Sequence, residues 1–86
     1  MGRLIVDVRE PFEYKSGHVK GSVNVPLSRL ERDVERVLED MDQDTELVIY
    51  CRSGSRASVA VSMLRNLGYS NLINGVNQDH VNAHYL

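Results

Sequence analysis

A single cysteine, Cys51, stands at the start of a short loop of small and basic residues. The loop reads Cys51-Arg52-Ser53-Gly54-Ser55-Arg56, and it joins an apolar run to a helical pattern. The backbone N–H groups of residues 52–56 are expected to converge into an anion-binding nest, with the positive end of the following helix and two arginines beside the thiol. These features favour a thiolate and should lower the pKa of Cys51 below its usual value of about 8.5. A cysteine that only fills a core needs none of them, so we interpret Cys51 as a nucleophile.

The spacing of the loop indicates which anion it holds. Cys51 and Arg56 form the pattern Cys-x4-Arg, whereas a similar phosphate cradle in protein phosphatases has the pattern Cys-x5-Arg. A shorter loop builds a smaller nest, which suits a terminal sulfur atom better than a tetrahedral phosphate. We therefore expect sulfur chemistry at Cys51, with a phosphatase as the disfavoured rival. The residues expected to bind the substrate are Arg52, Ser53, Gly54, Ser55 and Arg56.

Strand patterns alternate with helical patterns along the chain. Apolar runs predict strands at 4–8, 22–25, 46–51 and 71–73. Helices are predicted at 12–16, from a capping box at Ser28 and Glu31 onward, and from the loop to about residue 67. This order predicts a small parallel α/β sheet of four to five strands, flanked by helices on both faces. Ligands bind beyond the carboxyl ends of such strands, and Cys51 ends the most apolar one.

The C-terminal segment has no clear strand or helix pattern. Residues 76–86 are ambiguous between one helical turn and a frayed end. His80 and His84 have the i, i+4 spacing of metal ligands on a helix, but no third ligand is evident nearby, so we expect a solvated tail and no metal site. Phe12, Tyr50 and Tyr69 are expected to be packing residues.

Length and composition limit the classes of protein to consider. The 86 residues are enough for one domain, taken here as residues 1–86. The net charge is −2 with no basic block, so nucleic acid is not an expected partner. No apolar run is long enough to span a membrane and no signal peptide is visible, so we expect a cytoplasmic monomer. A mature exported form, for example in the periplasm, would look the same.

The stretch from Leu4 to Ile73 resembles rhodanese-like domains. The loop from Cys51 to Arg56 is similar to their active-site loop, and the residues from Ser58 to Tyr69 are similar to the helix and turn that follow it. The chain looks like the short form of the family, without an extra strand and helix before its first motif. It has Asn74-Gly75-Val76-Asn77 where many members carry Gly-Gly and a Trp. The first motif resembles the family signature at Asp7, Val8, Arg9, Glu13, Tyr14, Gly17, His18, Gly21, Asn24 and Pro26.

The resemblance implies a five-stranded rhodanese fold and a sulfurtransferase that carries a persulfide on Cys51. The sulfur donor would be thiosulfate or a similar compound, and the acceptor would be cyanide or a cellular thiol, including a protein, with no metal or organic cofactor. Asp7, Arg9, Glu13 and His18 would be structural supports, with His18 bonded to Glu13. The alternative is a persulfide-relay or binding module that receives sulfur from a partner and has little activity on thiosulfate.

Overall fold

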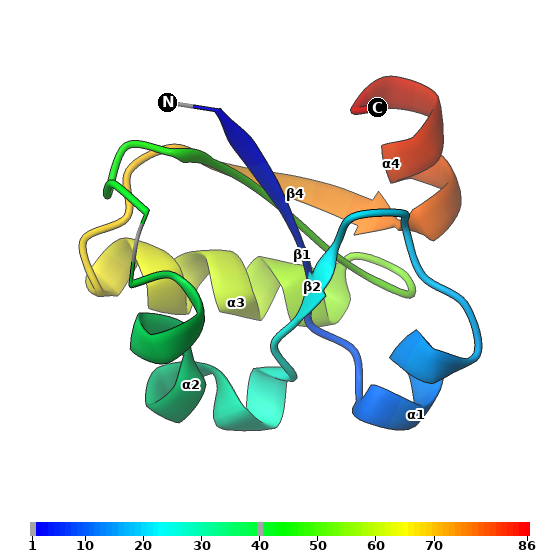
Figure 1. The fold of residues 1–86 in the computed structure, drawn as a ribbon, viewed down its shortest axis with the longest axis horizontal. Coiled ribbons are helices and arrows are strands. Elements are labelled where there is room, and N and C mark those ends of the chain that lie inside the picture. The colour runs from blue at the N-terminus through cyan, green and yellow to red at the C-terminus, as the bar shows by residue number, and fades with distance from the viewer. Residues whose placement is uncertain (1, 40) are drawn as a thin grey trace.

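A parallel four-stranded sheet runs through the middle of the molecule in the computed structural model, which describes residues 2–39 and 41–86 (Figure 1). Its order is β2-β1-β3-β4, and every neighbouring pair is parallel. The strands are β1 (Arg3–Asp7), β2 (Val23–Asn24), β3 (Glu46–Cys51) and β4 (Leu72–Asn77). The predicted α/β class is confirmed, and β3 has the predicted bounds. β4 is longer than predicted.

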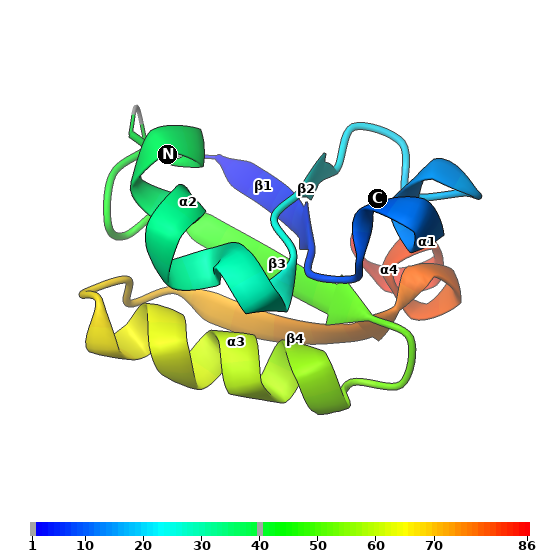
Figure 2. The ribbon, with the colours of Figure 1, turned by 90° about the horizontal axis from the view of Figure 1, so that it is seen from below.

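Helices cover both faces of this sheet, as predicted. They are α1 (Pro11–Lys15), α2 (Leu30–Val37), α3 (Ser55–Asn66) and α4 (Gln78–His84). Figures 1 and 2 show α2 and α3 side by side on one face, with α4 on the opposite face. None of these helices has the length and apolar character that crossing a membrane requires.

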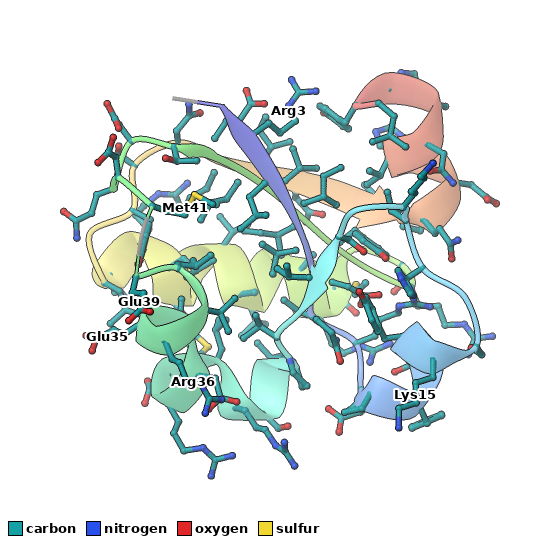
Figure 3. All side chains as sticks on the ribbon, in the orientation of Figure 1. Arg3, Lys15, Glu35, Arg36, Glu39 and Met41 are labelled. Carbon is teal, nitrogen blue, oxygen red and sulfur yellow. The ribbon has the colours of Figure 1, made fainter. Side chains whose placement is uncertain are left out.

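The two faces of the sheet contribute to two separate apolar cores. Side chains alternate along a strand, so neighbouring residues of β1 and β3 point to opposite faces. Val6 and Ile49 join the α2 and α3 core, while Ile5 and Val48 join the core under α4. The outer side of α2 is charged: Figure 3 shows Glu35 and Arg36 on the side away from the sheet. Because β3 is buried on both faces after its first residue, Glu46, the rest of its sequence is a continuous hydrophobic run.

The predicted start of the second helix is wrong. The short 3-10 turn η1 (Leu27–Arg29) comes first, and α2 begins only at Leu30, with no side-chain cap at its start. The Ser28 hydroxyl donates to a Glu10 carboxylate oxygen at 3.3 Å instead of capping α2. A capping box is present at the start of α1 instead, where the Glu13 side chain accepts a hydrogen bond from the Glu10 N–H at 3.1 Å.

The C-terminal segment is an ordered part of the fold, which contradicts the expected solvated tail. The Asn77 side chain caps α4 by accepting a hydrogen bond from the His80 N–H at 2.8 Å. Val81 is fully buried and packs in the core with Ile5 and Val48. Gly75 permits this approach, since a Cβ there would lie 2.7 Å from a Val81 methyl group. Phe12 was also expected to pack, but it is 74% exposed.

Candidate active site

The carboxyl ends of β1, β3 and β4 meet at one end of the molecule. Figures 1 and 2 show α1, α4 and the loop between β3 and α3 gathered there. Cys51 is the last residue of β3, and it pairs in register with Asn77, the last residue of β4. The parallel arrangement therefore brings the thiol beside the start of α4, as the topology of such sheets requires.

The loop after Cys51 turns its backbone N–H groups toward the sulfur. The Gly54 N–H lies 3.0 Å from Sγ, and the Ala57 N–H lies 3.4 Å from it. Gly54 has a φ of +93°, in the left-handed region where only glycine is free of strain, and it is the N-cap of α3. The expected convergence of N–H groups is thus present, although it includes the N–H of Ala57, beyond the expected range.

The electrostatic surroundings of Cys51 favour a thiolate. The residue is 1% exposed, and this burial alone would raise the pKa of its thiol. Backbone N–H groups outweigh burial, however, and lower the pKa below its ordinary value; they belong to Ala57, Ser53, Gly54 and Arg56. The start of the 12-residue helix α3 adds its positive end at the same place. The main source of stabilisation is therefore the backbone.

Arg56 already has a counter-ion. Its two terminal nitrogens donate to the Glu13 carboxylate of α1 at 2.7 and 3.1 Å. This bidentate pair raises the pKa of Arg56 and lowers the pKa of Glu13 to about 2, mainly through the hydrogen bonds between them. Arg56 consequently ties the loop to α1, a contact that the sequence did not predict. Arg52, by contrast, is exposed.

A pocket of about 220 Å³ opens above the thiol. Its lining residues come from three places: the end of β1, the loop after β3 and the start of α4. They are Arg9, Cys51, Arg52, Asn77, Gln78 and Asp79. Ser53 and Ser55 are exposed, with their hydroxyl oxygens 3.3 Å apart. Of the residues expected to bind substrate, Arg52 alone is among those that line this pocket.

An irregularity in β4 supports the same loop. The pairing of β3 with β4 shifts between Ile49 and Tyr50, so that one extra residue, Gly75, enters β4. Val76 next to it has a φ of +70°, which is unusual for a β-branched residue. The Asn74 side chain accepts a hydrogen bond from the Val76 N–H at 2.9 Å and donates one to the Gly54 carbonyl at 3.0 Å. Asn74 therefore connects the bulge to the loop that holds the thiol.

A buried polar network holds the end of β1. Asp7 is fully buried and accepts hydrogen bonds from Arg9 Nη2 at 2.7 Å and from the Tyr50 hydroxyl at 2.8 Å. The Tyr50 oxygen in turn accepts a hydrogen bond from the Val19 N–H at 3.0 Å, and Arg9 Nη2 donates to the Gly17 carbonyl at 2.7 Å. Burial raises the pKa of Tyr50. Tyr50 is thus a polar link as well as a packing residue.

The expected contact between His18 and Glu13 is wrong. His18 Nδ1 lies 2.8 Å from the Tyr14 carbonyl oxygen, and because a carbonyl can only accept, Nδ1 carries the proton. The ring also stacks on Tyr14, with centroids 3.6 Å apart and planes 9° from parallel. The Glu13 carboxylate is instead hydrogen-bonded to Arg56. His18 therefore fixes the end of α1, away from the residues that line the pocket.

Within residues 2–39 and 41–86, no group of three or more His, Cys, Asp or Glu side chains is arranged to hold a metal ion. The His80 and His84 rings lie 4.5 Å apart on α4, at an interplanar angle of 41°.

Comparison with known proteins identifies the family. The model of the rhodanese-like domain matches residues 1–78, which is most of the chain and includes Cys51 and its loop. The chain belongs to the rhodanese-like family. Its fold agrees with that assignment: a solved rhodanese with anions from Escherichia coli superposes with a TM-score of 0.81 at 26% identity, over 91% of this chain and 89% of that one.

Several relatives of this rhodanese-like chain carry sulfur-related names. A proposed mitochondrial thiosulfate sulfurtransferase of Schizosaccharomyces pombe is 34% identical over 83% of this chain and 56% of its own length. The thiosulfate:glutathione sulfurtransferase of Saccharomyces cerevisiae is 38% identical over 79% of this chain and 55% of its own. A proposed sulfur carrier protein of Bacillus subtilis, YrkF, is 35% identical over 84% of this chain and 37% of its own. The chain thus spans about half the length of these relatives, or less.

Sequence reasoning missed the part of the rhodanese-like site that β4 and α4 provide. Asn77, Gln78 and Asp79 line the pocket, and Asn74 holds the loop. One signal was available: the strand after α3 must end beside Cys51 in a parallel sheet, so the residues that follow it must reach the thiol.

Proposed function

We propose that this chain is a sulfurtransferase that moves a sulfane sulfur from thiosulfate, or a similar donor, to a thiophilic acceptor through a persulfide on Cys51. The observation that carries this proposal is the convergence of the Gly54 and Ala57 N–H groups on Cys51 Sγ. Such donors stabilise a negatively charged sulfur before and after transfer, in the way that an oxyanion hole stabilises oxygen. The names of the yeast relatives support the same reaction.

The first step loads the cysteine. The Cys51 thiolate attacks the outer sulfur of thiosulfate, a new S–S bond forms, and the bond to the sulfonate sulfur breaks with its electron pair leaving on sulfite. A thiolate already stabilised by N–H groups needs no general base, since it carries no proton to remove. The product is a persulfide anion whose terminal sulfur occupies the nest.

The second step unloads the cysteine. An acceptor such as cyanide or a thiolate attacks the terminal sulfur, and the electrons of the broken S–S bond return to Cys51 as a thiolate. Cyanide leaves as thiocyanate, and a thiol leaves as its persulfide. No external oxidant is consumed, because the donor supplies sulfur at the required oxidation level. Donor and acceptor react in turn, so the kinetics should be ping-pong.

The supporting residues have distinct tasks in this proposal. Asp7 and Tyr50 hold the end of β1, and Glu13 holds Arg56 and thereby the start of α3. His18 fixes α1 through Tyr14. In this proposal none of these four residues transfers sulfur itself.

The decisive experiment is an intact-mass measurement after treatment with thiosulfate. Wild-type protein should gain the mass of one sulfur atom, and addition of cyanide should remove it with formation of thiocyanate. Cys51→Ser should show neither event. A wild-type protein with no added sulfur from any donor, or a persulfide that persists in Cys51→Ser, would overturn the proposal.

The second candidate is a sulfur relay that receives its sulfur from a partner protein. It is favoured by the relative from Bacillus subtilis that is named as a proposed sulfur carrier. The same loop would serve, because the persulfide is the same species. Slow loading from thiosulfate together with fast loading from a protein persulfide would favour the relay. Release of phosphate from an aryl phosphate would instead indicate a phosphatase.

A further inference from the structure

The guanidinium of Arg9 is only partly used by the network that holds it. Nε donates to both Asp7 carboxylate oxygens at 3.0 Å, and Nη2 donates to Asp7 and to the Gly17 carbonyl, each at 2.7 Å. Nη1 makes no hydrogen bond with any residue that the structure describes. Since no buried side-chain nitrogen or oxygen of the described residues lacks a partner, Nη1 is open to solvent.

Arg9 is also one of the residues that line the pocket above the thiol. Arg9 is 91% buried, and it lines the pocket together with Cys51. Asp7 and the Gly17 carbonyl therefore hold Nε and Nη2, while the residue as a whole borders the pocket. Because a guanidinium carries five N–H donors, the Nη1 group of this buried arginine can still donate hydrogen bonds to a bound ligand.

The other cations near the thiol are less suited to hold a small anion. Both terminal nitrogens of Arg56 are engaged by Glu13, and Arg56 is not among the residues that line the pocket. Arg52 lines the pocket but is exposed, so its side chain must lose conformational entropy when it binds a ligand. Arg9 has lost that freedom already, because Asp7 and Gly17 hold it, and a donor fixed in advance binds at lower entropic cost.

We propose that Arg9 is the substrate-binding residue that receives the anionic end of the sulfur donor, with Nη1 donating to a sulfonate or carboxylate oxygen while the sulfane sulfur meets Cys51. This inference rests on the proposed sulfurtransferase function and names the class of donor: a small anion. The pocket, at about 220 Å³, lies below the range of roughly 300–1,000 Å³ for sites that hold drug-sized ligands. Asp7 neutralises much of the charge of Arg9, so the arginine acts chiefly as a fixed hydrogen-bond donor.

A pair of alkylating reagents tests this inference without requiring sulfur transfer. Iodoacetate and iodoacetamide have almost the same shape, but only iodoacetate carries a carboxylate. The rates at which both alkylate Cys51 are measured in the wild type, in Arg9→Gln and in Arg52→Gln. The two variants remove the same charge from the same pocket, so Arg52→Gln is the matched control for loss of charge alone.

The quantity to compare is the ratio of the iodoacetate rate to the iodoacetamide rate. Loss of one charge-assisted hydrogen bond should lower this ratio about tenfold in Arg9→Gln, and clearly less in Arg52→Gln. A ratio that stays within about twofold of wild type in Arg9→Gln, including the case where both reagents slow equally, shows a structural role only and overturns the inference. An equal fall in both variants also overturns it, since general charge would then explain the effect.

Two further measurements keep the inference testable. If Arg9→Gln does not fold, as judged by circular dichroism, Arg9→Lys is used in the same way, because lysine keeps the charge but lacks the planar set of guanidinium N–H donors. In the folded variants, Arg9→Gln should raise the KM for thiosulfate about tenfold and leave the cyanide step unchanged. If Arg9→Gln lowers the rate ratio as expected but the wild type transfers no sulfur, the proposed function is refuted and Arg9 remains an anion-binding residue.

Discussion

The ion pair between Glu13 and Arg56 should stabilise the fold by an amount that can be worked out. The pKa of Glu13 falls from an ordinary 4.5 to about 2, chiefly through its hydrogen bonds with Arg56. Each pKa unit corresponds to about 1.36 kcal/mol, so the shift sets a ceiling of about 3 kcal/mol. Because the Arg56 side chain keeps 33% of its exposure, water screens the pair, and we expect Glu13→Gln to cost about 1–2 kcal/mol of unfolding free energy at pH 7. Gln can still accept the Glu10 N–H, so the first turn of α1 is retained.

The stabilisation that Glu13 contributes should depend on pH. A carboxylate whose pKa is lowered by folding stabilises the native state above its unfolded pKa, near 4.5, and the stabilisation disappears as the pH falls toward about 2. Urea unfolding of wild type and Glu13→Gln should therefore show a difference that is constant from pH 7 to about 5.5 and more than half lost by pH 3.

Glu35→Gln is the control, since it makes the same chemical change on the outer side of α2 (Figure 3), where Glu35 is exposed and forms no ion pair with the described residues. It should change the unfolding free energy by less than about 0.5 kcal/mol. A Glu13→Gln effect that is as small as this, or one that does not vary with pH, would refute the assignment of the low pKa to the pair with Arg56.

Three other predictions address the thiol, the C-terminal helix and the buried network. The rate at which iodoacetamide alkylates Cys51, measured against pH, should give a thiol pKa below about 8.5. Gly54→Ala should raise that pKa, since alanine at a φ of +93° is strained and displaces the N–H nearest the sulfur. A wild-type pKa at or above about 8.5 would contradict the loop geometry. Val81→Ala should lower the unfolding free energy, measured with urea, by about 1–3 kcal/mol. The control Val59→Ala, at a site 51% exposed, should lower it by less than about 0.5 kcal/mol. Equal losses would mean that α4 does not pack against the sheet. Tyr50→Phe should cost about 1–3 kcal/mol because it leaves the Val19 N–H without a partner and removes one of the hydrogen bonds to buried Asp7, which keeps those from Arg9. Tyr85→Phe, whose hydroxyl bonds to none of the described residues, should be close to neutral in the same unfolding assay.

The elements that the sequence predicted well are those with strong local signals. β3 is a run of apolar residues because both of its faces are buried, and α3 begins at a glycine-containing loop and ends before Gly68. The position of Cys51 follows from these two neighbours. The nest of N–H groups was predictable for the same reason, since it depends on the consecutive backbone from Cys51 to Ala57.

The features that the sequence did not predict depend on distant partners. Arg56 loses its free charge to Glu13, which is 43 residues earlier in the chain. Ser28 does not cap α2, because Glu10 of another segment takes its hydroxyl. α4 has little helical signal of its own and is held by the burial of Val81 against β1 and β3. No local pattern contains these contacts, so propensity and periodicity alone cannot supply them.

The left-handed conformation of Val76 has a consequence for heat tolerance. A β-branched residue held at a φ of +70° stores roughly 1–2 kcal/mol of backbone strain. For a domain of 60–100 residues, each kcal/mol corresponds to about 4–8 °C in melting temperature. Asn tolerates this conformation far better, so Val76→Asn should melt several degrees higher than the natural sequence in calorimetry. The bulge that brings Asn77 beside the thiol is therefore also a site where thermal resistance can be recovered without touching either core.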